Sequence, residues 1–270
     1  MHFANVSVII PCYCCSKSIG RTVDSVLNQT MLPKEIILVD DCSNDSGATL
    51  QKLSKIKDSN QSILITIIEL NKNDGPGTAR NAGWDQASQP YIAFLDADDS
   101  WHPKKIEIQY GLMMSNQKVA LSFHRSQQIE SNENLVSDLA KFNIKLVTFR
   151  ALLLSNYVPT RSVMLKKSLP QRFYPGKRHA EDYLLWLKIA YVEGGIWFAD
   201  IILCHSYKRD FGEGGLNSFL YESHAGVLDT YKKILTDQLI SHLTYCALVV
   251  FESMKYIRRV FLVHFRGGIN

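Results

Sequence analysis

The segment Tyr91–Asp99 constrains the fold most, because it joins an apolar run to three closely spaced carboxylates. Tyr91–Leu95 has the length and composition of a buried strand, and Asp96, Asp98 and Asp99 follow at its carboxyl end. Crowded carboxylates resist burial unless a cation or hydrogen bonds compensate them. Hard oxygen ligands favour Mg²⁺ or Mn²⁺, usually shared with a substrate phosphate. Taken alone, the triplet is also typical of a solvated turn or a helix cap.

The surrounding pattern predicts a parallel sheet that is covered on both faces. Further apolar runs predict strands at 6–11, 35–39 and 63–70, and helical patterns separate them at 17–29, 46–57 and 78–87. Strands that alternate with helices in this way favour an α/β fold. The strand at 35–39 is followed by Asp40 and Asp41, and the strand at 91–95 by Asp96. Both strands therefore end in aspartates at the carboxyl edge of the sheet, where open α/β sheets bind ligands. The alternative is a pair of unrelated acidic loops.

Five motifs, in order and at natural spacing, resemble those of the family-2 glycosyltransferases of the GT-A fold. They are Val6–Tyr13, Val39–Asp45, Asn73–Gly83, Phe94–Asp99 and Glu181–Trp186. The resemblance is strong to about residue 110, moderate around 181, and thin at 118–175 and beyond 220. It implies a Rossmann-like, mixed or mostly parallel sheet flanked by helices. It also implies an inverting, metal-dependent enzyme that moves one hexose-type sugar from a nucleotide-sugar, with a UDP-sugar as the expected donor.

The resemblance assigns nucleotide-binding roles to individual positions. Asp41 is expected to contact the nucleobase, since a carboxylate suits the imide N–H of uracil. Pro11 and Tyr13 are expected to line the same pocket. Arg80 is expected to face the base or the diphosphate, where a planar guanidinium suits either partner. Asp96 is expected near the ribose.

The diphosphate leaving group explains why a metal is expected. Cleavage of the sugar–phosphate bond leaves negative charge on the β-phosphate, which Mn²⁺ or Mg²⁺ would stabilise. By resemblance, Asp98 is the expected direct ligand, and Asp99 assists it or caps the next helix. His205 follows a predicted strand at 196–204 and is a further candidate ligand, with a structural role as the alternative. The glycine-containing loop at 208–215 is expected either to close over the diphosphate or to be a solvated turn.

The acceptor hydroxyl needs a general base on the face of the sugar opposite the leaving group. The resemblance places this base at Asp182, near the start of a predicted helix at 181–192. Glu181 is expected to serve helix-end electrostatics or acceptor orientation. The alternative for both carboxylates is helix capping and interaction with the helix dipole.

The cysteines depart from the usual pattern. Cys42 stands where glycine is common, so its turn either does not need a positive φ or is strained. Cys12, Cys14 and Cys15 are interpreted as buried thiols, because zinc ligands normally come as spaced pairs with a second pair elsewhere.

The 270 residues, 46% of them hydrophobic, can bury a large core. We expect a catalytic domain over 1–215, divided into a nucleotide-sugar-binding half at 1–110 and an acceptor-side half at 111–215. A helical segment is expected at 216–270. Six cysteines at irregular spacing and no recognisable signal peptide predict a cytoplasmic protein.

Charge is divided unevenly between the two parts of the chain. Residues 1–110 carry ten Lys and Arg against thirteen Asp and Glu, and residues 111–270 carry twenty against thirteen, which gives the net +4. The acidic part suits a metal–nucleotide site, and the basic part suits anionic lipid or an acceptor diphosphate. Nucleic acid is not expected as a partner, because no recognised motif is present and the basic residues are not interleaved with aromatics.

The segment at 242–266 is rich in apolar residues, with Glu252, Lys255, Arg258 and Arg259 at helical spacing on one side. Its longest uncharged run, 242–251, is too short for the roughly 20 residues that a spanning helix needs. We therefore expect a basic amphipathic helix in the membrane interface, peripheral on the cytoplasmic face of the inner membrane. Packing on the core is the alternative. The expected acceptor is a saccharide, by analogy one linked to a polyprenyl diphosphate.

Two other functions remain open from sequence. A nucleotidyltransferase of the same fold would normally carry a glycine-rich basic loop after the first strand, which residues 12–18 lack. A non-catalytic nucleotide-sugar-binding scaffold would not need both Asp98 and Asp182.

Overall fold

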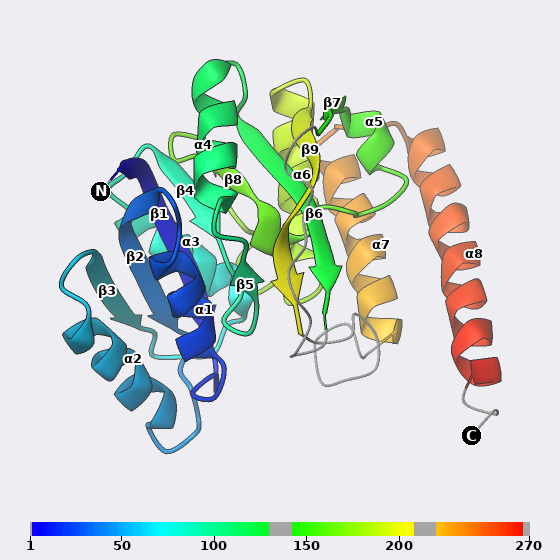
Figure 1. Ribbon diagram of the computed structural model, residues 1–270. Coiled ribbons are helices and arrows are strands. Elements are labelled where there is room, and N and C mark those ends of the chain that lie inside the picture. The colour runs from blue at the N-terminus through cyan, green and yellow to red at the C-terminus, as the bar shows by residue number, and fades with distance from the viewer. Residues whose placement is uncertain (1, 130–141, 208–219, 267–270) are drawn as a thin grey trace.

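The computed structural model describes residues 2–129, 142–207 and 220–266. These residues form a mixed sheet with helices on both faces (Figure 1). Its strands are β1 (Phe3–Cys12), β2 (Leu32–Asp40), β3 (Leu64–Glu69), β4 (Tyr91–Phe94), β5 (Ser100–Trp101), β6 (Leu121–Gln128), β7 (Ile144–Val147), β8 (Met164–Lys166) and β9 (Ile196–Ser206). They lie in the order β3-β2-β1-β4-β8-β6-β9-β5, and β7 pairs with β9 outside this path.

Strands β1 to β4 pair in parallel, as the sequence predicted. Strand β8 is antiparallel to both β4 and β6, and β6 is parallel to β9. The carboxyl ends of β1, β2, β4, β6 and β9 therefore lie along the same edge of the sheet, the lower edge in Figure 1. This geometry confirms the expected GT-A-like α/β architecture.

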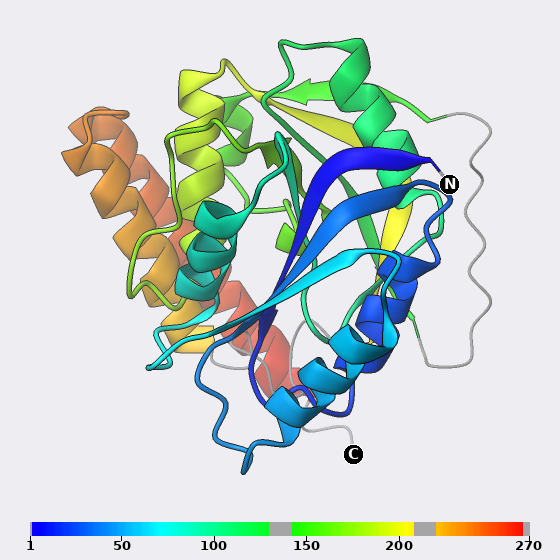
Figure 2. The same cartoon turned by 90° about the vertical axis from the view of Figure 1, so that its left-hand side faces the viewer.

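Helices cover each face of the sheet in turn (Figures 1 and 2). One face packs against α1 (Ile19–Leu27), α2 (Ala48–Ser59) and α4 (Lys105–Ser115), and the other against α3 (Pro76–Gln86) and α6 (Glu181–Val192). Helix α7 (Leu220–Thr236) contacts α6, and α8 (His242–Arg266) contacts α7, so α8 is the outermost layer.

Strand β1 shows why both faces need a cover. Val8 and Ile10 belong to one buried cluster, whereas Ile9 between them belongs to the other. Gly83 lets α3 approach this strand closely, because a Cβ atom there would lie 2.5 Å from Cγ2 of Ile9. The buried strands and the closely packed α3 together position the carboxyl-terminal edge of the sheet, where the carboxylate motifs lie.

In the middle of the chain, which carries no recognised motif, the described residues 118–129 and 142–175 form only short elements besides β6. These are β7, α5 (Phe149–Leu152), the 3₁₀ helix η1 (Thr160–Ser162) and β8. Among the described residues, no helix is both long enough and apolar enough to cross a bilayer.

Candidate active site

A pocket of about 360 Å³ lies where β1, β2 and β4 end. Six of the seven residues predicted for nucleotide or metal binding line it, namely Pro11, Tyr13, Asp41, Arg80, Asp96 and Asp98, and His205 does not. We call it the nucleotide pocket. The structure thus gathers the residues that the sequence motifs singled out, and their individual roles remain predictions.

Asp41 ties the start of α3 to the end of β2. Its carboxylate accepts hydrogen bonds from the backbone N–H groups of Asp74 (3.2 Å) and Gly75 (3.0 Å). Gly75 has φ of 91°, a conformation that favours glycine. Burial raises the pKa of Asp41, while the two amides and the charge of Arg178 oppose that rise. Asp41 therefore shapes the wall of the pocket as well as lining it.

Arg80 joins two motifs that are distant in sequence. It is 5% exposed. Its Nη2 donates to Oδ1 of Asp96 at 2.7 Å, and its Nη1 donates to Oε1 of Glu181 at 3.1 Å. The sequence assigned Arg80 to the base or the diphosphate. In the structure these two nitrogens bind protein carboxylates, so Arg80 links Asp96 to Glu181, and its contact with the base or the diphosphate stays a prediction.

The acidic motif after β4 presents its carboxylates in different environments. Asp99 is buried, which raises its pKa to about 8, and Arg161 opposes the shift from 3.4 Å. Asp98 is partly exposed and lines the pocket. Its backbone carbonyl accepts a hydrogen bond from Nη2 of Arg21 at 2.7 Å, and the Arg21 guanidinium lies 3.5 Å from the ring centre of Tyr207. The turn is therefore fixed while the Asp98 carboxylate borders the pocket.

These carboxylates fit a divalent ion that is shared with a substrate. The described residues include no group of three or more His, Cys, Asp or Glu that could hold a metal by themselves. Mg²⁺-type sites commonly use one or two carboxylates and complete their shell with substrate phosphates and water. Because Arg80 binds Asp96, Asp98 is the better candidate for direct coordination.

The backbone of His205 pairs with that of Ser100, next to the acidic motif after β4. His205 is almost fully buried on β9, and it is not among the described residues that line the nucleotide pocket. Burial, with a smaller effect of His102, lowers its pKa to about 4. Its metal-binding role remains a prediction without a supporting contact. The predicted loop at 208–215 lies outside the described residues.

Asp182 lies in the first turn of α6, beside the buried Glu181. Its Oδ2 accepts a hydrogen bond from Oγ1 of Thr160 at 3.1 Å, and its Oδ1 accepts one from Nδ2 of Asn156 at 3.4 Å. Burial raises the pKa of Asp182, and Arg80 opposes the shift. Burial and the neighbouring Asp182 raise the pKa of Glu181 to about 7, again opposed by Arg80. The environment of Glu181 therefore favours a carboxylate that takes up a proton near neutral pH, and burial shifts the pKa of Asp182 in the same direction.

Residues with positive φ cluster around these motifs. Cys14 (47°) and Cys42 (54°) follow β1 and β2, and Ala180 (54°) precedes Glu181. The Cys42 turn is therefore of the strained kind. Strained backbone of this kind is concentrated at functional sites. Cys14 is exposed, so the prediction that all three neighbouring cysteines are buried was wrong for that residue.

Arg178, which no motif indicated, also lines the nucleotide pocket. Its Nη2 donates to the backbone carbonyl of Asn73 at 2.6 Å and to its side-chain oxygen at 2.8 Å. The only sequence signal was a basic residue shortly before Glu181, which is too common a feature to single out.

Comparisons with known proteins agree with this geometry. The model of glycosyl transferase family 2 matches residues 7–173. A UDP-Glc:alpha-D-GlcNAc-diphosphoundecaprenol beta-1,3-glucosyltransferase of Escherichia coli, WfgD, is 34% identical over 185 residues, which cover 68% of this chain and 69% of WfgD. The putative teichuronic acid biosynthesis glycosyltransferase TuaG of Bacillus subtilis is 32% identical over 186 residues, covering 68% and 71%.

Solved structures share the fold at low sequence identity. S. aureus TarS in complex with UDP-GlcNAc superposes with a TM-score of 0.66 at 22% identity, covering 92% of this chain and 70% of that chain. A mannosyltransferase from Pyrobaculum calidifontis in complex with GDP-Man and Mn²⁺ gives 0.58 at 16% identity, covering 87% and 65%. Because the family model spans more than half of the chain and its motifs line one pocket, this protein belongs to glycosyl transferase family 2 and is a glycosyltransferase of the GT-A fold.

Proposed function

We propose that this enzyme transfers one sugar, with inversion, from a UDP-sugar to a saccharide acceptor in the synthesis of a surface polysaccharide. The observation that carries the proposal is the chain of contacts from the nucleotide pocket to Asp182. Arg80 lines the pocket and binds Glu181, and Asp182 is the next residue. A base beside the donor pocket is the arrangement that in-line displacement needs.

The residues of the chain divide the work of this reaction. Asp182 takes the proton of the acceptor hydroxyl as the hydroxyl attacks the anomeric carbon. Hydrogen bonds from Thr160 and Asn156 orient its carboxylate. Glu181 and Arg80 hold the start of α6 against the pocket. A Mn²⁺ or Mg²⁺ ion bound at Asp98 would neutralise charge on the departing diphosphate.

The names of related proteins support the choice of substrates. WfgD and WfaP of Escherichia coli are named as enzymes that use UDP-Glc and an undecaprenol-diphosphate-linked acceptor. We propose the same classes of donor and acceptor for this chain. A panel of nucleotide-sugars in a thermal-shift assay, with and without Mn²⁺, tests the donor, since a ligand that binds the folded state raises its apparent stability. A response to another nucleotide but none to uridine donors would contradict the proposal.

Asp41→Ala is expected to weaken UDP binding about tenfold and to relax discrimination between uridine and other bases, since a site that pairs with one base edge loses selectivity without its partner. The substitution also frees the backbone N–H groups of Asp74 and Gly75. Titration calorimetry with UDP, CDP and GDP measures both effects. Asp45→Ala is a matched control, because Asp45 caps the start of α2 through Thr49 and does not line the described pocket. An unchanged order of base preference in the Asp41 variant would assign base recognition to another residue.

We further propose that α8 attaches the enzyme to a membrane surface. The sequence placed Glu252, Lys255, Arg258 and Arg259 on one side of a basic amphipathic helix. Glu252 is 1% exposed, and it forms ion pairs with Lys255 (2.7 Å) and Arg259 on the same helix. Of the three basic residues, Arg258 is exposed, and Lys255 and Arg259 are half-buried.

The outward face of α8 is apolar instead. Large side chains that are more than half exposed recur along it at helical spacing, namely Leu243, Val250, Met254, Ile257 and Phe261. An apolar stripe of this kind, bordered by arginine, suits the headgroup boundary of an anionic bilayer. Figure 1 shows that α8 runs along the outside of the molecule toward the edge of the sheet that carries the nucleotide pocket.

The variant Val250→Ser, Met254→Ser and Ile257→Ser is expected to bind anionic vesicles on the order of 10- to 100-fold more weakly than the unmodified protein, because partial burial of each side chain contributes on the order of 1 kcal/mol. Vesicle flotation at low salt measures this. The control variant replaces three equally exposed apolar residues elsewhere, Leu64, Met114 and Val192, by serine. Equal loss in both variants, or no flotation of the unmodified protein, would contradict membrane attachment through α8.

A further inference from the structure

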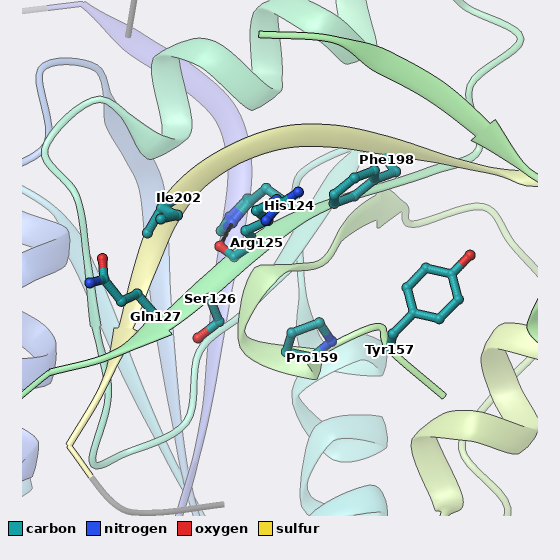
Figure 3. A pocket seen from close by; sticks show the side chains of 8 residues that line it. All are labelled: His124, Arg125, Ser126, Gln127, Tyr157, Pro159, Phe198 and Ile202. Carbon is teal, nitrogen blue, oxygen red and sulfur yellow. Dashed lines mark hydrogen bonds between the residues drawn. The ribbon is translucent and has the colours of Figure 1, made fainter. Parts of the chain in front are cut away.

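A second pocket, of about 490 Å³, shares no lining residue with the nucleotide pocket. It lies between β6, β9 and the loop that precedes η1, and we call it the β6–β9 pocket (Figure 3). Strand β6 contributes consecutive residues to its lining, because the pairing of β6 with β9 is irregular on both sides of Arg125. Such bulges turn side chains out of their regular alternation and are common beside active sites. No sequence motif pointed to this pocket.

One short segment connects the β6–β9 pocket with the candidate base. Asn156 and Thr160 both donate hydrogen bonds to the carboxylate of Asp182. Tyr157 and Pro159, which lie between them in sequence, line the pocket. The residues that orient the base and two residues of the pocket wall therefore belong to the same short segment.

Arg161, the residue after Thr160, contacts both the pocket lining and the acidic motif after β4. Arg161 donates from Nε to Oγ of Ser126 in the pocket lining at 2.8 Å, and its Nη1 lies 3.4 Å from Oδ2 of Asp99. The segment 156–161 thus contacts the base, the acidic motif and the pocket. A ligand that contacts Tyr157 and Pro159 would therefore lie against the segment that orients Asp182.

The pocket wall combines aromatic faces with uncharged polar groups. The ring centre of Phe123 lies 5.1 Å from that of Phe198 and 6.1 Å from that of Tyr157, and Tyr157 is 45% exposed. Ser126 and Gln127 add a hydroxyl and an amide. Figure 3 shows Tyr157 and Phe198 on the same side of the pocket, with the Tyr157 hydroxyl directed away from the other lining residues.

The charges around the pocket disfavour an anionic ligand. The guanidinium of Arg125 is paired with the carboxylate of Asp200. Burial lowers the pKa of His124 to about 3, so its imidazole is neutral at physiological pH. Its Nε2 is buried without a hydrogen-bond partner. Aromatic surface beside neutral donors and acceptors suits a ring that has both apolar C–H faces and hydroxyl groups.

We infer that the β6–β9 pocket binds a sugar ring of the acceptor, with Tyr157 as the surface on which that ring packs. The inference rests on the proposed glycosyl transfer and adds to it the place and the chemical class of acceptor recognition. The hydroxyl of Tyr157 is not required, because it points away from the lining. The diphosphate of a lipid-linked acceptor would lie elsewhere, since the pocket offers no uncompensated cation among its described residues.

Saturation-transfer NMR with methyl glycosides of GlcNAc, glucose and galactose tests this inference in the presence of UDP and Mn²⁺. The unmodified protein is expected to transfer saturation to the ring protons of at least one glycoside. Tyr157→Ala is expected to weaken that binding at least about tenfold, through lost apolar contact and ring packing. Tyr157→Phe keeps the ring and is expected to retain binding. Tyr221→Ala, which removes an exposed tyrosine of α7, is the matched control.

The thermal shift that UDP-sugars cause in each variant reports on donor binding alone. It therefore separates failure of the acceptor inference from failure of the proposed function. Tyr157→Ala with an unchanged UDP-sugar response and lost glycoside binding supports the inference. Glycoside binding that is equal in Tyr157→Ala and the unmodified protein overturns it, as does the absence of binding of all three glycosides to the unmodified protein. Failure of the unmodified protein to respond to any UDP-sugar overturns the proposed donor instead.

Discussion

Replacing Asp182 by asparagine is expected to cut sugar transfer by about two to four orders of magnitude, the span typical for loss of a general base. UDP-sugar and metal affinity should stay near the level of the unmodified enzyme, because Asp182 is not among the described residues that line the nucleotide pocket. The asparagine keeps an oxygen that can accept the hydrogen bond of Thr160. It cannot take up the proton of the acceptor hydroxyl. Single-turnover transfer rates, measured beside calorimetric UDP affinity, separate these two effects.

Glu181→Gln is the matched control, since it makes the same chemical change one residue earlier. The glutamine can still accept a hydrogen bond from Arg80, so the start of α6 should keep its position. We expect a smaller loss of rate than in the Asp182 variant. If Glu181→Gln abolishes transfer while Asp182→Asn keeps most of it, the base is Glu181. If both variants stay active, this motif is not the catalytic centre.

Asp98→Asn is expected to abolish the metal-dependent part of UDP-sugar binding while the fold is kept. Asp98 is partly exposed, and its backbone is held by Arg21, so the neutral side chain disturbs little of the packing. The loss arises because a neutral amide oxygen is a much weaker ligand for Mn²⁺ than a carboxylate. Donor binding is measured with limiting Mn²⁺ and again after chelation with EDTA.

In the unmodified enzyme EDTA should lower donor affinity, and in the Asp98 variant it should change nothing further. Asp58→Asn, which alters an exposed aspartate on α2, controls for the loss of one negative charge. Transfer at the unmodified rate by Asp98→Asn in limiting Mn²⁺ would show that Asp98 is not the metal ligand.

The fold of residues 1–110 could be predicted from sequence, because each strand and helix there has a pattern that can be recognised within a short segment. Apolar runs of strand length alternate with helices, and parallel strands place their carboxyl ends on one edge. Asp41 and Asp98 follow strands β2 and β4, so their meeting in one pocket follows from topology alone. The same reasoning cannot give side-chain partners. Arg80 binds Glu181 across 101 positions of sequence, and only the packing of α3 against α6 brings them together.

The orientation of α8 shows a second limit. Helical periodicity identifies the two sides of a helix but does not say which side faces the protein. Charged residues usually face water, yet Glu252 is buried and pairs with Lys255 and Arg259. The β6–β9 pocket shows a third limit, because two strands and a loop form it with no motif in common.

The most direct test of the account is the product formed from UDP-glucose, a short-chain alkyl α-D-GlcNAc diphosphate and Mn²⁺, followed by NMR. The account predicts release of UDP and a new β-linked sugar from the α-linked donor, with both abolished in Asp182→Asn. A product that retains the α configuration would contradict the inverting mechanism. Release of a nucleoside monophosphate in place of UDP would identify a nucleotidyltransferase and contradict the central claim.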